Sequence, residues 1–451
     1  MAQEILYLGI DWGTHSSKWA CRIGQAGRYM PLFPLYSSDL MRVGDDLVFS
    51  PPDDVEDDDL VVRSLKGTLI QDPLGQPFWA SEARLDTGTS LGEAVAFSLC
   101  TLLADAKRRI TKETGPQLAE RLDIGFSFPN WVVDPRKKYR VAASNFTAAV
   151  MVAMDLNGHV KAAELPRPGK GFPIAEWRGL VHDSLLRVGP AAKPDLDVEN
   201  ITQTSYSLDD VEGAWSFLME SGAAGLPYLR AMNVEMVPGC PGLAKLLVVD
   251  VGAGSTDVGY MLRVKNRSTG AEKFYYFRPA SSFPEAGNVL TDEIMKYYAQ
   301  RNQPLTYREA EARKLQRSDW ANLPFVQSWI RRICGHVQKY LEGVADKRWL
   351  PMPVTLEVVV TGGSGLVPGL ADGIGEAVHE ALESKGFGLA AKKINLASRH
   401  LPRLDFKTEA EYARRAVCLG SADVNKPGFR YMQKMDPPEP VVRFKTAPRW
   451  V

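Results

Sequence analysis

The sequence predicts an α/β protein made of two similar halves, and three observations carry that prediction. Apolar runs typical of strands alternate with segments of helical periodicity, as in sheets that are covered by helices. One glycine-rich hairpin pattern occurs around Asp11 and again around Asp250. The chain has 451 residues, of which 45% are hydrophobic, so it can bury a large core in more than one folded unit.

The expected elements follow one another along the whole chain. Short apolar runs predict strands at 5–10, 17–23, 122–128, 246–251, 257–264 and 354–361. Apolar residues at helical spacing predict helices at 91–113, 209–232, 285–301, 307–317, 325–348 and 369–386. Three segments are expected to be irregular: an acidic loop at 50–59, an insertion with loops at 157–205, and a proline-rich extended tail at 425–451.

Composition and charge exclude several classes of protein. The 54 basic and 54 acidic residues cancel, so no nucleic-acid partner is expected. The sequence contains no apolar run of about 18 residues, so no membrane-spanning helix is expected. The five cysteines are widely spaced without a C-x-x-C pair, which favours reduced thiols over disulfides or a zinc site. These features predict a cytoplasmic protein.

The first candidate site is a glycine-rich hairpin between two apolar strands. Its residues are Asp11, Gly13, Thr14, His15, Ser16 and Lys18. Small residues at the tip let backbone N–H groups approach an anion closely. Asp11 ends its strand and could hold a hydrated cation, whereas Lys18 could reach phosphate oxygens.

The second hairpin repeats this design, and a third glycine-rich turn follows it. The second hairpin contains Asp250, Gly252, Ala253, Gly254, Ser255, Thr256 and Asp257. If the two hairpins faced each other, they would hold a phosphate chain from both sides. The third turn, Gly362-Gly363-Ser364, lies between an apolar strand and a helix, where a flat or anionic ligand could approach the backbone.

In this order and spacing, the three segments resemble the phosphate-one, phosphate-two and adenosine motifs of the actin, sugar-kinase and heat-shock ATPase superfamily. The closest likeness is to the nucleotide-binding domain of the seventy-kilodalton heat-shock chaperones, and it covers most of residues 1–424. The resemblance implies two actin-like (ribonuclease-H-like) lobes around a central nucleotide cleft. The implied parts are lobe I at 1–245 with the insertion at about 157–205, lobe II at 246–424 with a helical subdomain at about 290–350, and the tail at 425–451.

Shorter segments resemble further parts of the chaperone domain. They are the lysine-bearing segment at 63–67, the strand and helix at 126–136, the connecting segment at 220–225, the phosphate-contacting turn at 286–291, the Glu-x-x-Lys helix at 311–314 and the closing helix at 416–422. The site residues that this resemblance adds are Lys66, Glu220, Gly287, Glu311 and Lys314.

The resemblance implies an ATPase that binds ATP or ADP with Mg²⁺. Asp11 and Asp250 would hold the Mg²⁺ shell through water, and Glu220 would order that shell. Lys66 would steer the attacking water, with Asp250 or Asp257 accepting its proton. The two hairpins would contact the phosphates. The nucleoside would be held by Gly362, Gly363, Ser364, Glu311 and Lys314, with Gly287 at a phosphate-contacting turn.

The chain departs from the chaperone pattern at several positions. Leu366 stands where the family has its adenine-stacking arginine, and Ser221 replaces the connecting proline. Lys18 is typical of actins and of plasmid-segregating actin-like proteins. The stretch from Asn130 to Glu220 is longer than in the family. About 30 residues follow the closing helix, too few for the family's peptide-binding domain and lid.

These features leave four functions open. The first is a chaperone-like ATPase switch that acts on a protein partner. The second is an actin-like cytoskeletal or plasmid-segregation protein that assembles into ATP-dependent filaments. The third is a small-molecule kinase, for which the sequence shows no convincing sugar-recognition motif. The fourth is a scaffold that binds nucleotide without cleaving it.

Overall fold

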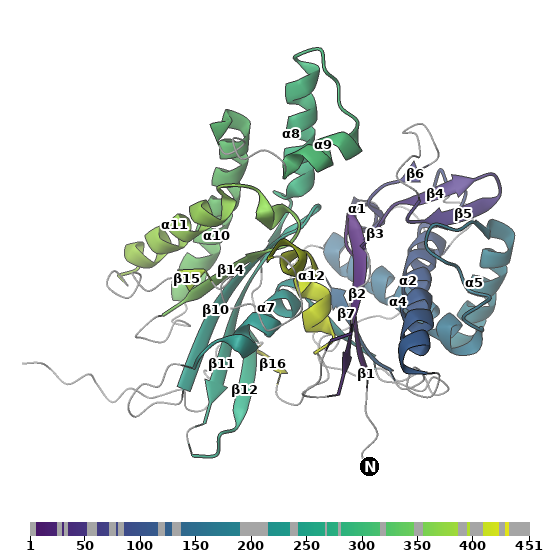
Figure 1. Ribbon diagram of the computed structural model, residues 1–451, viewed down its shortest axis with the longest axis horizontal. Helices are drawn as coiled ribbons and strands as arrows, with labels where there is room; N and C mark the ends of the chain where they lie inside the picture. Colours follow the sequence, from purple (N-terminus) through teal and green to yellow (C-terminus); the bar gives the residue numbers. More distant parts are fainter. Residues whose placement is uncertain are drawn as a thin grey trace, which may run out of the picture.

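The computed structural model confirms the α/β fold class: two large mixed sheets lie side by side with helices around them (Figure 1). It describes residues 6–24, 29–30, 35–51, 61–71, 78–79, 85–115, 122–128, 137–189, 215–234, 242–266, 268–277, 281–315, 322–346, 355–386, 395–396, 409–423 and 429–432. Within these ranges, no helix combines the length and the apolar character needed to cross a membrane.

The first large sheet has the strand order β3-β2-β1-β7-β9. Its strands are β1 (Leu6–Asp11), β2 (Ser16–Ile23), β3 (Tyr36–Ser37), β7 (Leu122–Phe128) and β9 (Trp215–Met219). The first three strands form an antiparallel meander, whereas β7 and β9 run parallel to β1. Helices α2 (Leu91–Thr114) and α4 (Lys137–His159) pack together in this half. The α2 helix begins where the sequence predicts, because Ser90 and Glu93 form a reciprocal capping box.

The second large sheet repeats the order and strand directions of the first. It runs β15-β14-β10-β11-β12-β16, with β13 paired to β11. Its strands are β10 (Gly242–Val251), β11 (Thr256–Lys265), β12 (Glu272–Phe277), β13 (Ser281–Phe283), β14 (Glu357–Thr361), β15 (Asn395–Leu396) and β16 (Phe429–Met432). The β10-β11-β12 meander is antiparallel, and β14 and β15 run parallel to β10 as β7 and β9 do to β1.

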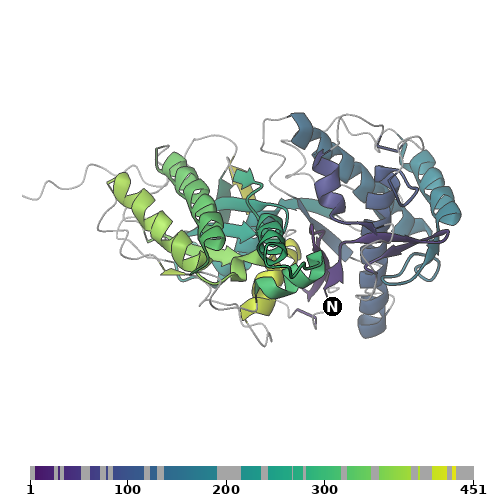
Figure 2. The same cartoon turned by 90° about the horizontal axis from the view of Figure 1, so that it is seen from above.

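The helices of the second half lie apart from those of the first. They are α8 (Gly287–Ala299), α9 (Tyr307–Lys314), α10 (Pro324–Asp346) and α11 (Leu370–Ser384). Figure 2 shows these green helices on one side of the molecule and the blue and purple elements of the first half on the other. Each half has its own apolar core of buried side chains.

Two helices join the halves, and each packs on the sheet of the half that it does not follow. The α7 helix (Glu220–Ala231) comes after β9 and packs on β10 and β11, whereas α12 (Glu409–Ser421) comes after β15 and packs on β1 and β2 (Figure 1). The helices touch closely, since a Cβ on Gly420 would collide with the Ala223 backbone. A third apolar cluster at this crossing includes Ala20 from one sheet and Val248 from the other.

A small sheet belongs to the first half and corrects one expectation. Its order is β6-β4-β5-β8, formed by β4 (Leu40–Val43), β5 (Asp46–Phe49), β6 (Val61–Val62) and β8 (Phe172–Pro173). Helix α1 (Leu65–Gln71) follows β6, and α5 (Ile174–Val188) follows β8. The segment 157–205 is therefore not simply looped. Trp177 anchors α5, because its fully buried ring donates through Nε1 to the Glu93 carbonyl at 2.9 Å.

The helix expected at 209–232 is wrong in its first part. Residues 215–219 form β9, and the helix begins only at Glu220. Phe217 packs into the core of the first half and Leu218 into the cluster at the helix crossing, as alternate side chains of a strand must. A short apolar run fits a strand or a buried helix equally well. Here, pairing with β7 makes the run a strand.

Some expectations fall on other parts of the chain. Most of the acidic segment 50–59, residues 129–136 and residues 190–205 lie outside the described residues. In the tail, residues 429–432 form strand β16, which pairs in parallel with β12. The rest of 425–451 lies outside the described residues as well.

Candidate functional site

The two glycine-rich hairpins have the same backbone register. In the first, Asp11 stands opposite Lys18, and in the second, Asp250 stands opposite Asp257. The tips of the hairpins meet: a Cβ on Gly254 would lie 2.6 Å from the Thr14 hydroxyl. Only glycine permits so close an approach. The repeated motif thus places two similar turns face to face.

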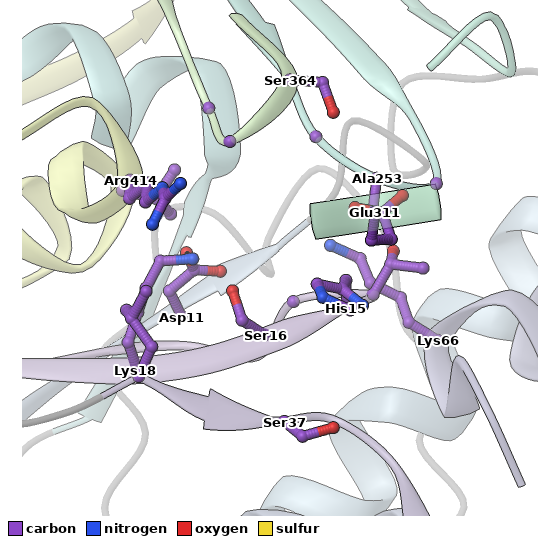
Figure 3. A pocket seen from close by; sticks show the side chains of 18 of the residues that line it. Asp11, His15, Ser16, Lys18, Ser37, Lys66, Ala253, Glu311, Ser364 and Arg414 are labelled. Atoms are coloured by element: carbon purple, nitrogen blue, oxygen red, sulfur yellow. Dashed lines mark ion pairs between the residues drawn. The ribbon is translucent and has the colours of Figure 1, made fainter. Parts of the chain in front are cut away.

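A cavity of about 650 Å³ lies where the hairpins meet, a size typical of small-molecule sites. Figure 3 shows side chains from several elements around it. The predicted site residues that line it are Asp11, Gly13, Thr14, His15, Ser16, Lys18, Lys66, Glu220, Asp250, Gly252, Ala253, Gly254, Ser255, Asp257, Glu311, Lys314, Gly362, Gly363 and Ser364.

Two predicted residues lie behind the wall of the cavity. The Thr256 hydroxyl donates to the Glu285 carbonyl at 2.7 Å and is fully buried. Gly287 donates its N–H to the Gly252 carbonyl at 3.0 Å, and a Cβ there would lie 2.8 Å from the Lys314 ammonium. Both residues support the lining turns instead of facing the cavity.

The first hairpin is electrically balanced. The Lys18 ammonium lies 2.5 Å from the Asp11 carboxylate, and the Ser127 hydroxyl donates to the same carboxylate at 3.3 Å. Burial disfavours the charged form of Lys18, but the attraction of Asp11 prevails and the pKa of Lys18 is raised. Lys18 therefore stays charged and is held against the first strand.

The second hairpin carries unbalanced negative charge. Asp250 and Asp257 stand opposite each other, and both are buried. The Ser255 hydroxyl donates to the Asp257 carboxylate at 2.8 Å. Burial, with repulsion from Asp257 and Asp11, raises the pKa of Asp250 to about 7, although two lysines act in the opposite direction. Such a carboxylate is stabilised by a bound cation or by a proton.

Lys66 and Glu220 come from distant segments and form a buried ion pair in the cavity wall. Ser64 precedes α1 with φ of 59°, a conformation that is rare for a side-chain-bearing residue, and its hydroxyl accepts the Gly67 N–H at 3.1 Å. This turn directs Lys66 into the cavity. Burial raises the pKa of Glu220, whereas the Lys66 ammonium opposes that rise.

Lys314, which is buried, and Glu311, which is partly buried, form an ion pair on α9. The Lys314 ammonium is 2.5 Å from the Glu311 carboxylate, and it donates to the Gly287 carbonyl at 3.2 Å and to the Thr291 hydroxyl at 3.1 Å. Burial lowers the pKa of Lys314, and the Glu311 charge opposes this. The pair therefore fixes α9 against the start of α8.

The third motif turns at Gly362, whose φ of 83° favours glycine. Its N–H donates to the Ala413 carbonyl at 3.2 Å, and the Thr361 hydroxyl donates to the same oxygen at 2.9 Å. The turn is thus fixed to α12. Leu366 ends the short 3₁₀ turn η4 (Ser364–Leu366) and is not among the lining residues, whereas Leu315 is.

The donor set of the cavity fits a hydrated divalent cation of the Mg²⁺ type. Lys18, Lys66 and Lys314 each pair with one carboxylate, so the aspartates of the second hairpin leave an acidic excess. Among the described residues, no three His, Cys, Asp or Glu side chains are arranged to ligate a metal together. Mg²⁺ usually keeps several waters and binds one or two carboxylates, which is what Asp11 and Asp250 offer.

Sequence reasoning missed the contacts that cross the cavity. Arg308 on α9 lies 3.9 Å from Asp39 in the first half. The neighbouring Tyr307 ring has its centroid 6.3 Å from that of His15, and the Arg63 guanidinium lies 5.6 Å from the Tyr307 centroid. We call these five residues the cross-cavity clasp. His15 is a predicted site residue, but no local sequence signal marks its contacts or those of the other four, because the segments meet only in the folded chain.

Arg414 on α12 also lines the cavity and was not expected there.

A comparison of the chain with models of known protein families, and with curated proteins, found no match.

Proposed function

We propose that this chain is a Mg²⁺-dependent ATP-binding and ATP-hydrolysing protein of the heat-shock and actin type. It would act as a nucleotide-driven conformational switch on a protein partner. One observation carries the proposal: the two equivalent hairpins meet tip to tip over one cavity, which also receives Lys66, Glu220 and the third glycine turn. Backbone N–H groups at such turns bind phosphates, so a polyphosphate fits between them.

The repeated topology supports an interpretation as two actin-like lobes. Both sheets have an antiparallel meander followed by two parallel strands, and the helices after β9 and β15 pack on the opposite sheet. The cavity adjoins the carboxyl ends of β1 and β10, where ligands bind in many α/β proteins. Two helices crossing at Gly420 and Ala223 form the natural hinge between the lobes.

The proposed chemistry assigns separate tasks to the cavity residues. Bound Mg²⁺ supplies neutralisation of phosphate charge. Asp11 and Asp250 would hold its water shell, since Asp11 ends β1 and Asp250 lies one residue before the end of β10. The ion pair with Glu220 fixes the Lys66 ammonium, so that it can orient the attacking water. Asp250 can accept a proton near neutral pH, because burial raises its pKa to about 7.

Closure of the two halves would be the output of the switch. A polyphosphate held by both hairpins favours the closed arrangement, and the cross-cavity clasp adds contacts that exist only when the halves are close. Loss of the terminal phosphate removes part of the attraction between the halves. A partner that binds only one arrangement would then be released or captured.

One observation favours a second candidate, an actin-like protein that forms ATP-dependent filaments. Lys18 lines the cavity and is held by Asp11 beside the first phosphate-binding turn, at the position typical of actin-like proteins. Under this alternative, the same nucleotide cycle would drive self-assembly in place of a change in partner binding.

The test is a titration of the full-length protein with ATP and ADP, with Mg²⁺ and with EDTA, followed by calorimetry and by phosphate release. We expect binding that weakens at least tenfold without Mg²⁺, together with slow hydrolysis. Binding without hydrolysis would favour a scaffold, and no binding of either nucleotide would reject the proposal. Sedimentation velocity then separates the two candidates, because only the filament alternative predicts fast-sedimenting polymers with Mg²⁺ and ATP.

A further inference from the structure

The cations that line the cavity differ in one respect. Each of four has a carboxylate close to it among the described residues: Lys18 with Asp11, Lys66 with Glu220, Lys314 with Glu311 and Arg308 with Asp39. The fifth, Arg414, has neither an ion pair nor a side-chain hydrogen bond with any described residue. Its side chain is exposed. A cation that faces a binding cavity without a protein partner is available to a ligand.

The fold fixes where Arg414 lies. The preceding residue, Ala413, accepts hydrogen bonds from the Gly362 N–H at 3.2 Å and the Thr361 hydroxyl at 2.9 Å, so α12 cannot shift away from the glycine turn. The next turns of α12 pack on β1, where a Cβ on Gly9 would collide with the Cys418 carbonyl. Arg414 is therefore held between the third motif and the base of the first hairpin.

The close-up view agrees with this placement. Figure 3 shows Arg414 on the same side of the cavity as Lys18 and Asp11, whereas Glu311 and Lys66 lie on the opposite side. A nucleotide that spans the cavity from the third motif to the hairpin tips would pass Arg414 with its α- and β-phosphates. Guanidinium groups bind phosphate oxygens through two parallel hydrogen bonds, which gives both strength and direction.

We infer that Arg414 binds the diphosphate of the nucleotide and makes the site select phosphorylated ligands over the bare nucleoside. This inference rests on the proposed nucleotide-binding function. Arg414 completes the phosphate site from α12, which lies on neither of the two hairpins. Because α12 is also one of the two helices at the hinge, the contact ties the diphosphate to the element that joins the halves.

The matched control is the neighbouring arginine. Arg415 is on the same helix and is not a lining residue, and its guanidinium donates to the Glu411 carbonyl at 3.4 Å. Arg414→Ala and Arg415→Ala therefore remove the same side chain from adjacent positions. The Arg414→Lys variant keeps the charge but loses the two-point hydrogen bonding.

The experiment measures the affinity of the full-length variants for ATP, ADP, adenosine and inorganic pyrophosphate by calorimetry with Mg²⁺. A lost charge-assisted contact weakens binding by about 10- to 100-fold. We expect Arg414→Ala to lose this much for ATP, ADP and pyrophosphate but less than twofold for adenosine. Arg414→Lys should lie between it and the wild type, and Arg415→Ala should match the wild type. Thermal melting of each variant shows whether it is folded.

The possible failures can be told apart. If Arg414→Ala binds ADP as the wild type does, or loses adenosine and ADP affinity equally, Arg414 is not a diphosphate ligand although the site still binds nucleotide. If Arg415→Ala loses as much affinity as Arg414→Ala, the loss comes from a disturbance of α12 and not from a contact of Arg414. The inference is then rejected. If the wild type itself binds none of the four probes, the proposed function fails and the inference fails with it.

Discussion

The two glycine-rich hairpins share one backbone design and differ at one decisive position. Both place an aspartate at or next to the end of the first strand, opposite a charged residue near the start of the returning strand. In the first hairpin that residue is Lys18, and in the second it is Asp257. The first hairpin therefore neutralises its own carboxylate, whereas the second concentrates negative charge in a buried place.

This difference shows how two copies of one motif can take different electrostatic roles in a site. The Asp11–Lys18 pair of the first hairpin is satisfied without a ligand, and Lys18 stays charged beside the glycine-rich turn. In the second hairpin, repulsion between two buried carboxylates is costly, and a bound cation would relieve it. Under the proposed function, this repulsion between carboxylates would be the source of the hairpin's affinity for the cation.

The largest effect is expected for Asp250→Asn. This change keeps the shape of the side chain but removes the charge that would hold the water shell and accept a proton. We expect ATP turnover to fall by about 100-fold or more while ADP still binds. Phosphate release and calorimetry measure the two properties. The exposed Asp372 serves as the control, so that Asp372→Asn should leave turnover unchanged. Normal turnover in Asp250→Asn would show that the second hairpin has no role in the chemistry.

The second prediction converts one hairpin into the other. Asp257→Lys gives the second hairpin the charge pattern of the first. We expect the ligand-free protein to melt at a higher temperature, by roughly 1 °C for each 1 kcal/mol gained. We also expect Mg²⁺ to lose its stabilising effect on melting. Asp257→Asn removes the charge without adding a cation and should lie in between. If Mg²⁺ stabilises Asp257→Lys as much as the wild type, charge is not what distinguishes the hairpins.

The third prediction concerns pH. The folded protein raises the pKa of Asp250 to about 7 from its ordinary value of 3.8, so between these values the folded state holds more protons than the unfolded state. Stability without ligand should therefore fall as pH rises from 4 to about 7, by roughly 1–3 kcal/mol in all. Urea unfolding at several pH values measures this change, and Asp250→Asn should show a smaller one. If the stability of the wild type and of Asp250→Asn depends equally on pH, a group other than Asp250 causes the pH dependence.

Affinity for Mg²⁺ should change in the opposite direction to stability. As Asp250 loses its proton near pH 7, the cavity gains negative charge and should bind the cation more tightly. Calorimetric titration with Mg²⁺ and ADP at pH 6 and pH 8 tests this expectation on the same samples.

The smallest effect is expected at the cross-cavity clasp. Arg308 is partly exposed, and its guanidinium lies 3.9 Å from the carboxylate of the buried Asp39, so their contact contributes only about 0.2–1 kcal/mol. Arg308→Ala should speed the release of bound ADP by about two- to fivefold, because this energy stabilises only the closed arrangement. Stopped-flow displacement of a fluorescent ADP analogue measures the rate. The exposed Arg332 on α10 is the control. An unchanged release rate would show that the cross-cavity clasp does not stabilise the proposed closed arrangement.

The sequence by itself determined several of the local elements and the two hairpins, but it did not predict helix α4 or strand β12. Apolar runs and glycine positions predict strands at the correct places, and the paired motifs predict that Asp11 and Asp250 are equivalent, which the register confirms. The failures occur where local patterns are ambiguous. The run before Glu220 is apolar enough for a helix or a strand. The α5 segment does have apolar residues at helical spacing, such as Ile174, Trp177 and Val181, but it follows a stretch rich in proline and glycine that favours loops.

Only the tertiary structure decided which charges in the cavity are balanced and which are not. Sequence spacing cannot show that Lys66 meets Glu220, that Asp39 meets Arg308, or that α12 carries Arg414 to the cavity with no carboxylate beside it in the described chain. These side chains come from segments far apart, and their pairing depends on how two sheets and two crossing helices are placed. Strand and turn formation depends on neighbours along the chain, whereas electrostatics depends on neighbours in space.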